Sequence, residues 1–220
     1  MSRSRCLRLL ISFVAVLVAG AAMSSAEWAF EVHGGAPHGM DRTVHIDMEM
    51  DEDIELDASM KSRPFTSPYY YDLRLIRWSD DGATGWALDL LHHKLILEEP
   101  TDEVQVFQLT HGYNLLTVQR LWRKGATILM AGAGVVIAHP ENTIHGRSYQ
   151  ENEGIFGWGY LPSGPVVIAG AGRQLKLTSR FYLVGDVRAS LSHVDVPVVG
   201  GRATMTDVSL HFLGGAGFLF

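Results

Sequence analysis

Side chains of two kinds alternate along the C-terminal segment 203–220, and the chain ends on a phenylalanine. Asp207, Ser209 and His211 fall on one face of this segment. The other face carries Thr204, Thr206, Val208, Leu210, Phe212, Phe218 and Phe220. Because successive side chains of a β-strand point to opposite sides, this pattern predicts a strand that separates lipid from a polar lumen.

The N-terminal segment 1–26 has the features of a signal peptide. Three arginines precede an apolar run over residues 9–22, and Ser24, Ser25 and Ala26 supply the small residues of a cleavage site. The alternative is a membrane anchor, but a run of about 14 residues is short for a span of about 20. We therefore expect export, with the mature chain starting at Glu27. The only cysteine, Cys6, would leave with the peptide, so the mature chain would contain no disulfide.

Composition excludes two classes of protein. Segment 1–26 holds three of the 18 basic residues, so the mature chain keeps 15 against 24 acidic residues, a formal charge of −9. That charge argues against nucleic acid as a partner. Beyond the leader no apolar stretch approaches 18 residues, which excludes a helical membrane protein. The length of 27–220 fits one domain.

Period-two alternation divides the mature chain into eight segments of about ten residues or more, with short turns and long loops in alternation. The predicted fold is therefore all-β: an eight-stranded antiparallel transmembrane β-barrel in the outer membrane, with short periplasmic turns and long external loops. The predicted strands are Trp28–Pro37, Tyr69–Trp78, Gly85–Leu97, Gly112–Trp122, Ile128–His139, Val166–Leu177, Arg180–Val194 and Ala203–Phe220. The predicted long connections are 38–67, 98–111, 140–165 and 195–202.

Closure of the sheet follows from hydrogen bonding, because a lipid-exposed strand edge would leave backbone groups unpaired. Side chains fill the interior of a barrel of this size, so we expect a monomer without an open pore. Inward parity falls on Glu31, His33, Asp72, Arg74, Asp89, His93, Asp186, Arg188, Asp207, Ser209 and His211, which predicts an internal salt-bridge network. Outward parity includes Trp28, Phe30, Val32, Trp86, Leu88, Phe181, Leu183, Val187 and Leu191. Aromatic girdles are expected at Trp78, Tyr113, Trp122, Tyr182 and Phe220, although Tyr182 has lumen parity.

The external loop 38–67 contains a second period-two ribbon, 44–60, with apolar residues on one face. On its other face, one histidine at position 45 is followed by six acidic residues. This predicts a hairpin turning near Asp51–Asp53 that continues the barrel wall outside the membrane. Its acidic face is either solvated or a divalent-cation site.

Nearly all ten histidines fall at predicted external strand ends or in external loops, which indicates a site facing the outer leaflet. A metal could be held by residues drawn from His92, His93, His111 and His139, with Glu141 or Asp89, although their spacing matches no tight metal motif. Ser192 and His193 are neighbours on a predicted strand and so point to opposite faces, which makes a catalytic serine–histidine pair a weak hypothesis.

Four blocks follow one another along this chain: Pro68–Arg74, Leu88–Lys94, Thr110–Thr117, and Gly132–Val135 leading to Ala138–Glu141. In their order and spacing they resemble the lipid A oxidase family of outer-membrane barrels. The resemblance implies an enzyme in the outer membrane that oxidises the proximal glucosamine of lipid A, in lipopolysaccharide, with molecular oxygen. Carried over by position, the candidate residues are Asp89, His93, Lys94, His111, Asn114, His139 and Glu141.

From these residues we assign expected roles. The catalytic candidates are His93, His111, His139 and Glu141, and the metal-ligand candidates are His93, His111, His139 and Asp89. Lys94, Asn114 and Arg147 are expected to bind substrate, since bases must offset repulsion between an acidic chain and lipid phosphates. The cofactor is unknown; a divalent metal is expected, because side chains alone do not readily pass electrons to oxygen.

Two other functions fit the same barrel. A non-catalytic barrel that stabilises the envelope or mediates adhesion would leave lipid A unaltered and would not depend on His111 or His139. A lipid A deacylase would remove one acyl chain and depend on a serine.

Overall fold

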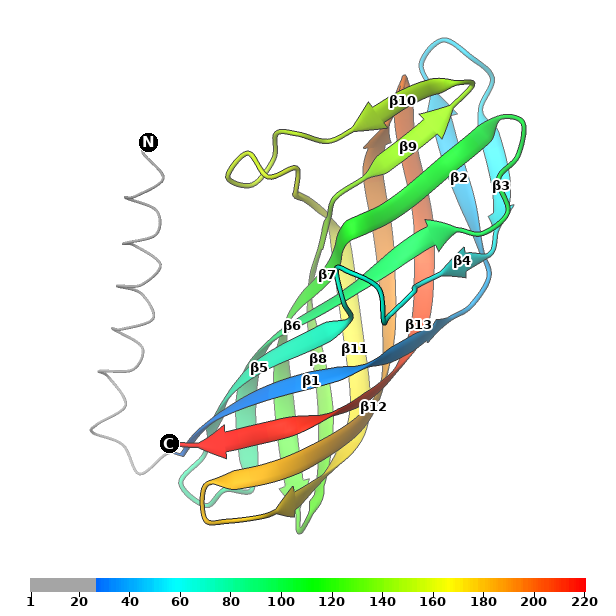
Figure 1. Cartoon of the computed structure of the whole chain (residues 1–220). Helices are drawn as coiled ribbons and strands as arrows, with labels where there is room; N and C mark the ends of the chain where they lie inside the picture. The colour runs from blue at the N-terminus through cyan, green and yellow to red at the C-terminus, as the bar shows by residue number, and fades with distance from the viewer. Residues whose placement is uncertain (1–26) are drawn as a thin grey trace.

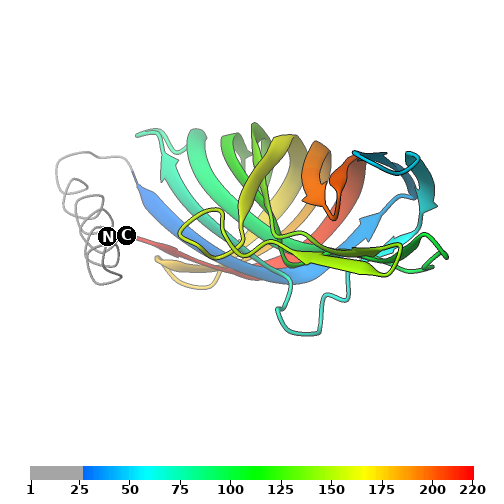
Figure 2. The same ribbon diagram turned by 90° about the horizontal axis from the view of Figure 1, so that it is seen from above.

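The computed structural model describes residues 27–220 and is an antiparallel sheet of 13 strands. The expected signal peptide, residues 1–26, lies outside the described residues. Eight strands form a closed ring, and seen from above they curve around an interior (Figure 2). The ring consists of β1 (Trp28–Gly39), β5 (Tyr71–Trp78), β6 (Thr84–Leu97), β7 (Val104–Lys124), β8 (Thr127–Ala138), β11 (Leu161–Lys176), β12 (Phe181–Val198) and β13 (Gly201–Leu219). Residues 27–220 include no helix long and apolar enough to cross a membrane.

The ring closes between the first and last strands, as the sequence predicts. β1 pairs with β13 on one side and with β5 on the other. The main-chain N–H of Trp28 donates to the carbonyl of Phe220 over 3.2 Å, and the chain ends at the same end of the barrel as β1 begins (Figure 1). Closure leaves the ring without a free edge in the membrane.

Five shorter strands extend the barrel at its external end. They are β2 (Arg42–Met48), β3 (Ile54–Ala58), β4 (Met60–Lys61), β9 (Glu141–Ile144) and β10 (Arg147–Gln150). The predicted hairpin in the first long loop is confirmed: β2 pairs with β3 and also with β13, so it continues the wall. Its apolar positions face inward and its acidic positions are exposed.

Three predicted loops are wrong in whole or in part, because their residues belong to strands. β7 begins at Val104 and pairs with β9, so most of 98–111 is strand. The connection 140–165 contains β9, β10 and the start of β11. β12 and β13 pair up to Val198 and Gly201, which leaves a two-residue turn where we predicted the connection 195–202. These errors have one cause: the strands continue as paired ribbons beyond the membrane, where polar composition no longer marks a loop.

The predicted facing of the side chains is confirmed on both sides of the wall. All the inward polar residues are buried, while Phe30, Trp86 and Leu88 are among the exposed apolar residues. Trp122 and Phe220 are exposed as girdle residues should be. Trp78, Tyr113 and Tyr182 are wrong as girdle residues: all three are buried, because their strand parity points them into the lumen.

The lumen is filled in layers. Near the periplasmic end an apolar cluster surrounds Trp78, and a larger apolar cluster fills the external half. Between them lies an ionic layer, which confirms the predicted salt-bridge network. Its members are Glu31, His33, Asp72, Arg74, Asp89, Asp186 and Arg188.

Each arginine of the ionic layer binds several carboxylates. Arg74 contacts Glu31, Asp89 and Asp186 at 2.9–3.1 Å. Arg188 contacts Asp72, Asp89 and Asp186 at 2.7–3.0 Å. Buried carboxylates are tolerated when charged partners and hydrogen bonds surround them in this way.

Candidate functional site

A local irregularity of β7 creates an outward-facing group of polar side chains. His93 of β6 pairs with Tyr113, whereas Leu95 pairs with Leu109, so β7 has two extra residues between these pairs. The bulge turns His111 outward, and its side chain is 57% exposed. On the neighbouring ribbon β8 ends at Ala138 and β9 starts at Glu141, which pairs with Gln108. Bulges re-aim side chains in this manner.

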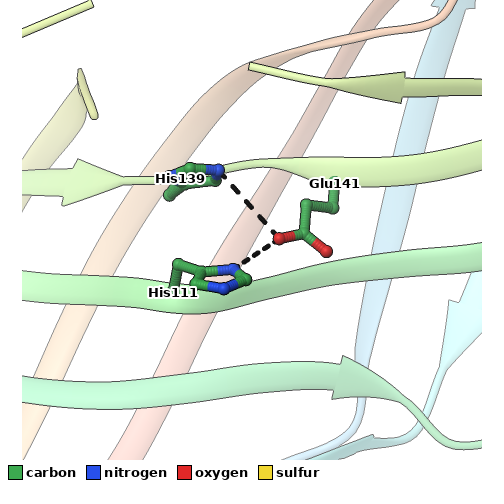
Figure 3. Close-up of side chains that lie close together, drawn as sticks. All are labelled: His111, His139 and Glu141. Carbon is green, nitrogen blue, oxygen red and sulfur yellow. Dashed lines mark hydrogen bonds and ion pairs between the residues drawn. The ribbon is translucent and has the colours of Figure 1, made fainter. Parts of the chain in front are cut away.

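His111, His139 and Glu141 point toward one another (Figure 3). Nδ1 of His111 lies 2.5 Å from Oε1 of Glu141, and Nε2 of His139 lies 4.0 Å from the same oxygen. One ligand atom from each residue lies within 4.8 Å of the other two. Within residues 27–220 this is the one group of three or more histidine, cysteine or acidic side chains with such spacing. We call it the His–Glu cluster.

Neighbouring groups hold the His–Glu cluster in place. Nε2 of Gln108 donates to Oε2 of Glu141 over 2.6 Å, and the hydroxyl of Tyr160 donates to the carbonyl of His111 over 2.6 Å. The Tyr160 ring meets His139 edge-on at 5.5 Å. Burial lowers the pKa of His139, and the adjacent His111 lowers this pKa further, which favours the neutral imidazole that binds metals.

A row of polar side chains continues from the cluster across the outer wall. Tyr71, His92 and Asn114 are in register on β5, β6 and β7. Nδ1 of His92 lies 2.8 Å from Oδ1 of Asn114, and the Tyr71 ring stacks on His92 at 4.8 Å. We call Tyr71, His92, Asn114 and Tyr160, together with the His–Glu cluster, the outer polar strip.

Gly112 allows two parts of the strip to meet. A Cβ at this position would lie 2.3 Å from Nδ2 of Asn114 and 2.7 Å from a ring carbon of Tyr160. Any larger residue would therefore push these side chains apart. The absence of a side chain at Gly112 makes the strip continuous from His92 to the His–Glu cluster.

The strip lies near the external membrane interface. His139 follows the first residue of β8 by 12 positions. At about 3.4 Å per residue and a strand tilt of about 40°, that places it roughly 30 Å above the periplasmic turns. The apolar band of such barrels is about 25 Å tall, so the strip stands at headgroup level.

The predicted site residues are divided among several places. The structure brings together His111, His139 and Glu141, with Asn114 nearby. Asp89 instead lies in the ionic layer, and His93 is buried in the lumen with its ring 5.3 Å from that of His211. Neither reaches the His–Glu cluster.

The two predicted bases also lie apart from the cluster. Nζ of Lys94 donates to the carbonyl of Thr66 over 2.9 Å. Arg147 pairs with Asp51 at 2.5 Å, at the opposite end of the β9–β10 hairpin from Glu141. His33 lies in the ionic layer, where its Nδ1 lies 2.6 Å from Asp72, as its inward parity predicts, and therefore does not belong to the predicted external group of histidines.

Sequence reasoning missed Tyr71, Gln108 and Tyr160 as members or supports of this site. His92 and Asn114 have the parity of the lipid-facing residues, and a polar pair on that face was a usable signal. Tyr160 and Gln108 gave no such signal, since their position depends on the bulge and on the loop before β11.

An apolar outer wall, a filled polar and apolar lumen, and a polar strip at headgroup level define the class of this protein: it is an outer-membrane β-barrel of eight membrane-crossing strands. No protein-family model matches the chain, and no curated protein sequence matches it. Ail, the attachment invasion locus protein of Yersinia pestis, is similar with a TM-score of 0.40 and 12% identity, over 90% of this chain and 100% of Ail. Ail in complex with the heparin analogue sucrose octasulfate gives a TM-score of 0.39 and 12% identity, over 89% and 97%. Neisserial surface protein A gives 0.32 and 9%, over 86% and 97%.

Proposed function

We propose that this barrel is an enzyme that modifies lipid A, as an oxidase acting on the proximal glucosamine. The observation that carries the proposal is the His–Glu cluster, which faces outward at headgroup level. Lipid A lies in the outer leaflet with its sugars at that level, so its glucosamine could reach the strip without leaving the membrane. The resemblance to the lipid A oxidase family supports the same assignment.

The donor set fits a divalent metal. Two histidines and one carboxylate bind zinc in hydrolases and iron(II) in oxygen-using enzymes. Within residues 27–220, neither ring nitrogen of the buried His139 has a hydrogen-bond partner, which leaves one free to bind a metal. A bound iron would supply the electron transfer to oxygen that side chains cannot perform. Gln108 would orient Glu141 as a ligand by bonding its second oxygen.

The outer polar strip suits a sugar. The exposed His111 and the hydroxyl of Tyr160 offer donors and acceptors, and the ring of Tyr71 offers an apolar face, while His92 and Asn114 are buried. Below the strip, exposed side chains such as Leu88 and Val118 give acyl chains an apolar surface. A lipid with a saccharide headgroup would therefore meet matching chemistry at both of its ends.

Mass spectrometry of lipid A tests the proposal directly. Cells that carry the gene should show an oxidised proximal glucosamine, and His139→Ala should abolish the product. His193→Ala is the control, since His193 is an outward histidine that lies on β12, away from the cluster. Unmodified lipid A in cells with the intact gene would reject the activity.

The same measurement separates the alternatives. A non-catalytic barrel predicts identical lipid A with and without the gene, and no effect of His111→Ala. A deacylase predicts the loss of one acyl chain. For that activity the structure offers Ser190, whose Oγ lies 2.9 Å from Nε2 of His211, but both are buried in the lumen, away from lipid.

A further inference from the structure

The loop between β10 and β11, residues 151–160, exposes two large aromatic side chains. Phe156 and Trp158 are 67% and 65% exposed, and their ring centroids lie 5.5 Å apart. Figure 1 shows this loop standing beside the barrel wall rather than across the open end. We call residues 151–160 the aromatic arm.

The aromatic arm is an ordered structure. Its main chain is held by hydrogen bonds from Ile155 to Tyr160 at 2.7 Å and from Gly159 to Glu153 at 2.7 Å. Phe156 has φ of +56°, a conformation that bulky residues rarely adopt. The fold of the arm thus keeps the Phe156 ring exposed at the expense of a strained backbone, which is typical of a functional position.

Both ends of the aromatic arm are attached to the His–Glu cluster. The N–H of Glu151 donates to the carbonyl of Pro140 over 3.2 Å, and the Tyr160 hydroxyl binds the carbonyl of His111. A Cβ at Gly159 would lie 2.5 Å from the His139 ring, so the arm packs directly against that ligand candidate. The arm therefore forms one side of the site.

We propose that Phe156 and Trp158 insert into the outer leaflet and hold a lipid molecule against the outer polar strip. The ends of the arm fix it at the level where the lipid-facing wall meets the headgroups, so its rings continue an apolar surface already in contact with lipid. Tryptophan favours this interface, and paired exposed aromatic rings are unfavourable in water. At the base of the arm, the carboxylate of Glu151 accepts hydrogen bonds from the Tyr149 hydroxyl and from the Glu153 N–H.

Depth-dependent quenching tests the lipid contact. The chain has one cysteine, so Cys6→Ser with Trp158→Cys gives a single labelling site for a fluorophore in full-length protein. In phosphatidylcholine vesicles, lipids brominated near the headgroup should quench this label. A label at Met50→Cys, at the 93% exposed tip of the β2–β3 hairpin, should not be quenched. Equal, weak quenching at both positions would overturn the proposal. It would also be overturned if the label at 158 were shielded from water only because copies of the protein associate with one another.

The positioning role rests on the proposed function and needs a second measurement. Phe156→Ser with Trp158→Ser keeps Gly159 and Tyr160, and it should lower the fraction of oxidised lipid A about tenfold while the barrel still assembles. Unchanged oxidation would overturn the positioning role. If the label at 158 is quenched but no variant or wild type oxidises lipid A, the proposed function fails and the lipid contact stands.

Discussion

Replacing Arg188 by methionine should strongly destabilise the barrel. The guanidinium is fully buried and makes five contacts of 2.7–3.2 Å with Asp72, Asp89 and Asp186. In the variant Asp89 and Asp186 would keep Arg74, whereas Asp72 would keep only His33. Removing one partner of a buried ion pair costs about 3–5 kcal/mol, and methionine fills most of the space, so the loss should be mainly electrostatic.

Equilibrium unfolding in urea, followed by tryptophan fluorescence in detergent micelles, measures this loss. Arg202→Met is the matched control, because Arg202 pairs with Asp195 at 2.8 Å on the surface and should contribute less than about 1 kcal/mol. Adding Asp72→Asn to the Arg188→Met variant should restore part of the stability, since an uncompensated charge disappears. Equal losses in the Arg188 and Arg202 variants, or no recovery in the double variant, would refute the electrostatic account.

Two pairs of glycine substitutions test close packing. Gly215→Ala should lower the free energy of unfolding by about 1–3 kcal/mol, because its Cβ would lie 2.1 Å from a main-chain oxygen of β1; Gly214→Ala meets nothing within 4 Å, and equal losses in the two would contradict this. Gly159→Ala should weaken binding of Zn²⁺ or Fe²⁺ about tenfold or more in titration calorimetry, because its Cβ would displace His139. Gly146→Ala is the control with a similar φ, +72° against +74°, and open space around it; a matching loss of affinity there would show that backbone strain, not displacement, is responsible.

Strand positions and facing could be predicted from the sequence because the backbone imposes a period of two on every residue of a strand. The errors at Trp78 and Tyr113 arose where residue type was given more weight than parity. Both side chains fill the lumen near apolar neighbours, as their parity requires.

The site could be predicted only in part. His111, His139 and Glu141 were candidates by position, but their meeting depends on a two-residue bulge in β7 and on the step from β8 to β9. Two extra residues leave the parity of β7 unchanged on either side, with Leu109 and Tyr113 both buried, but His111 within the bulge is turned outward, so period-two counting fails at that residue. For the same reason the sequence grouped His93 with His111, although they face opposite sides of the wall.

The filled lumen limits how a lipid can arrive. With an ionic layer held between two apolar clusters there is no axial route through the barrel, so a lipid that reaches the outer polar strip travels within the leaflet. Such a search takes place in two dimensions, and its rate is governed by the surface density and lateral mobility of the lipid instead of its concentration in solution. Stiffening the outer leaflet would then slow encounters while leaving the barrel itself unaltered.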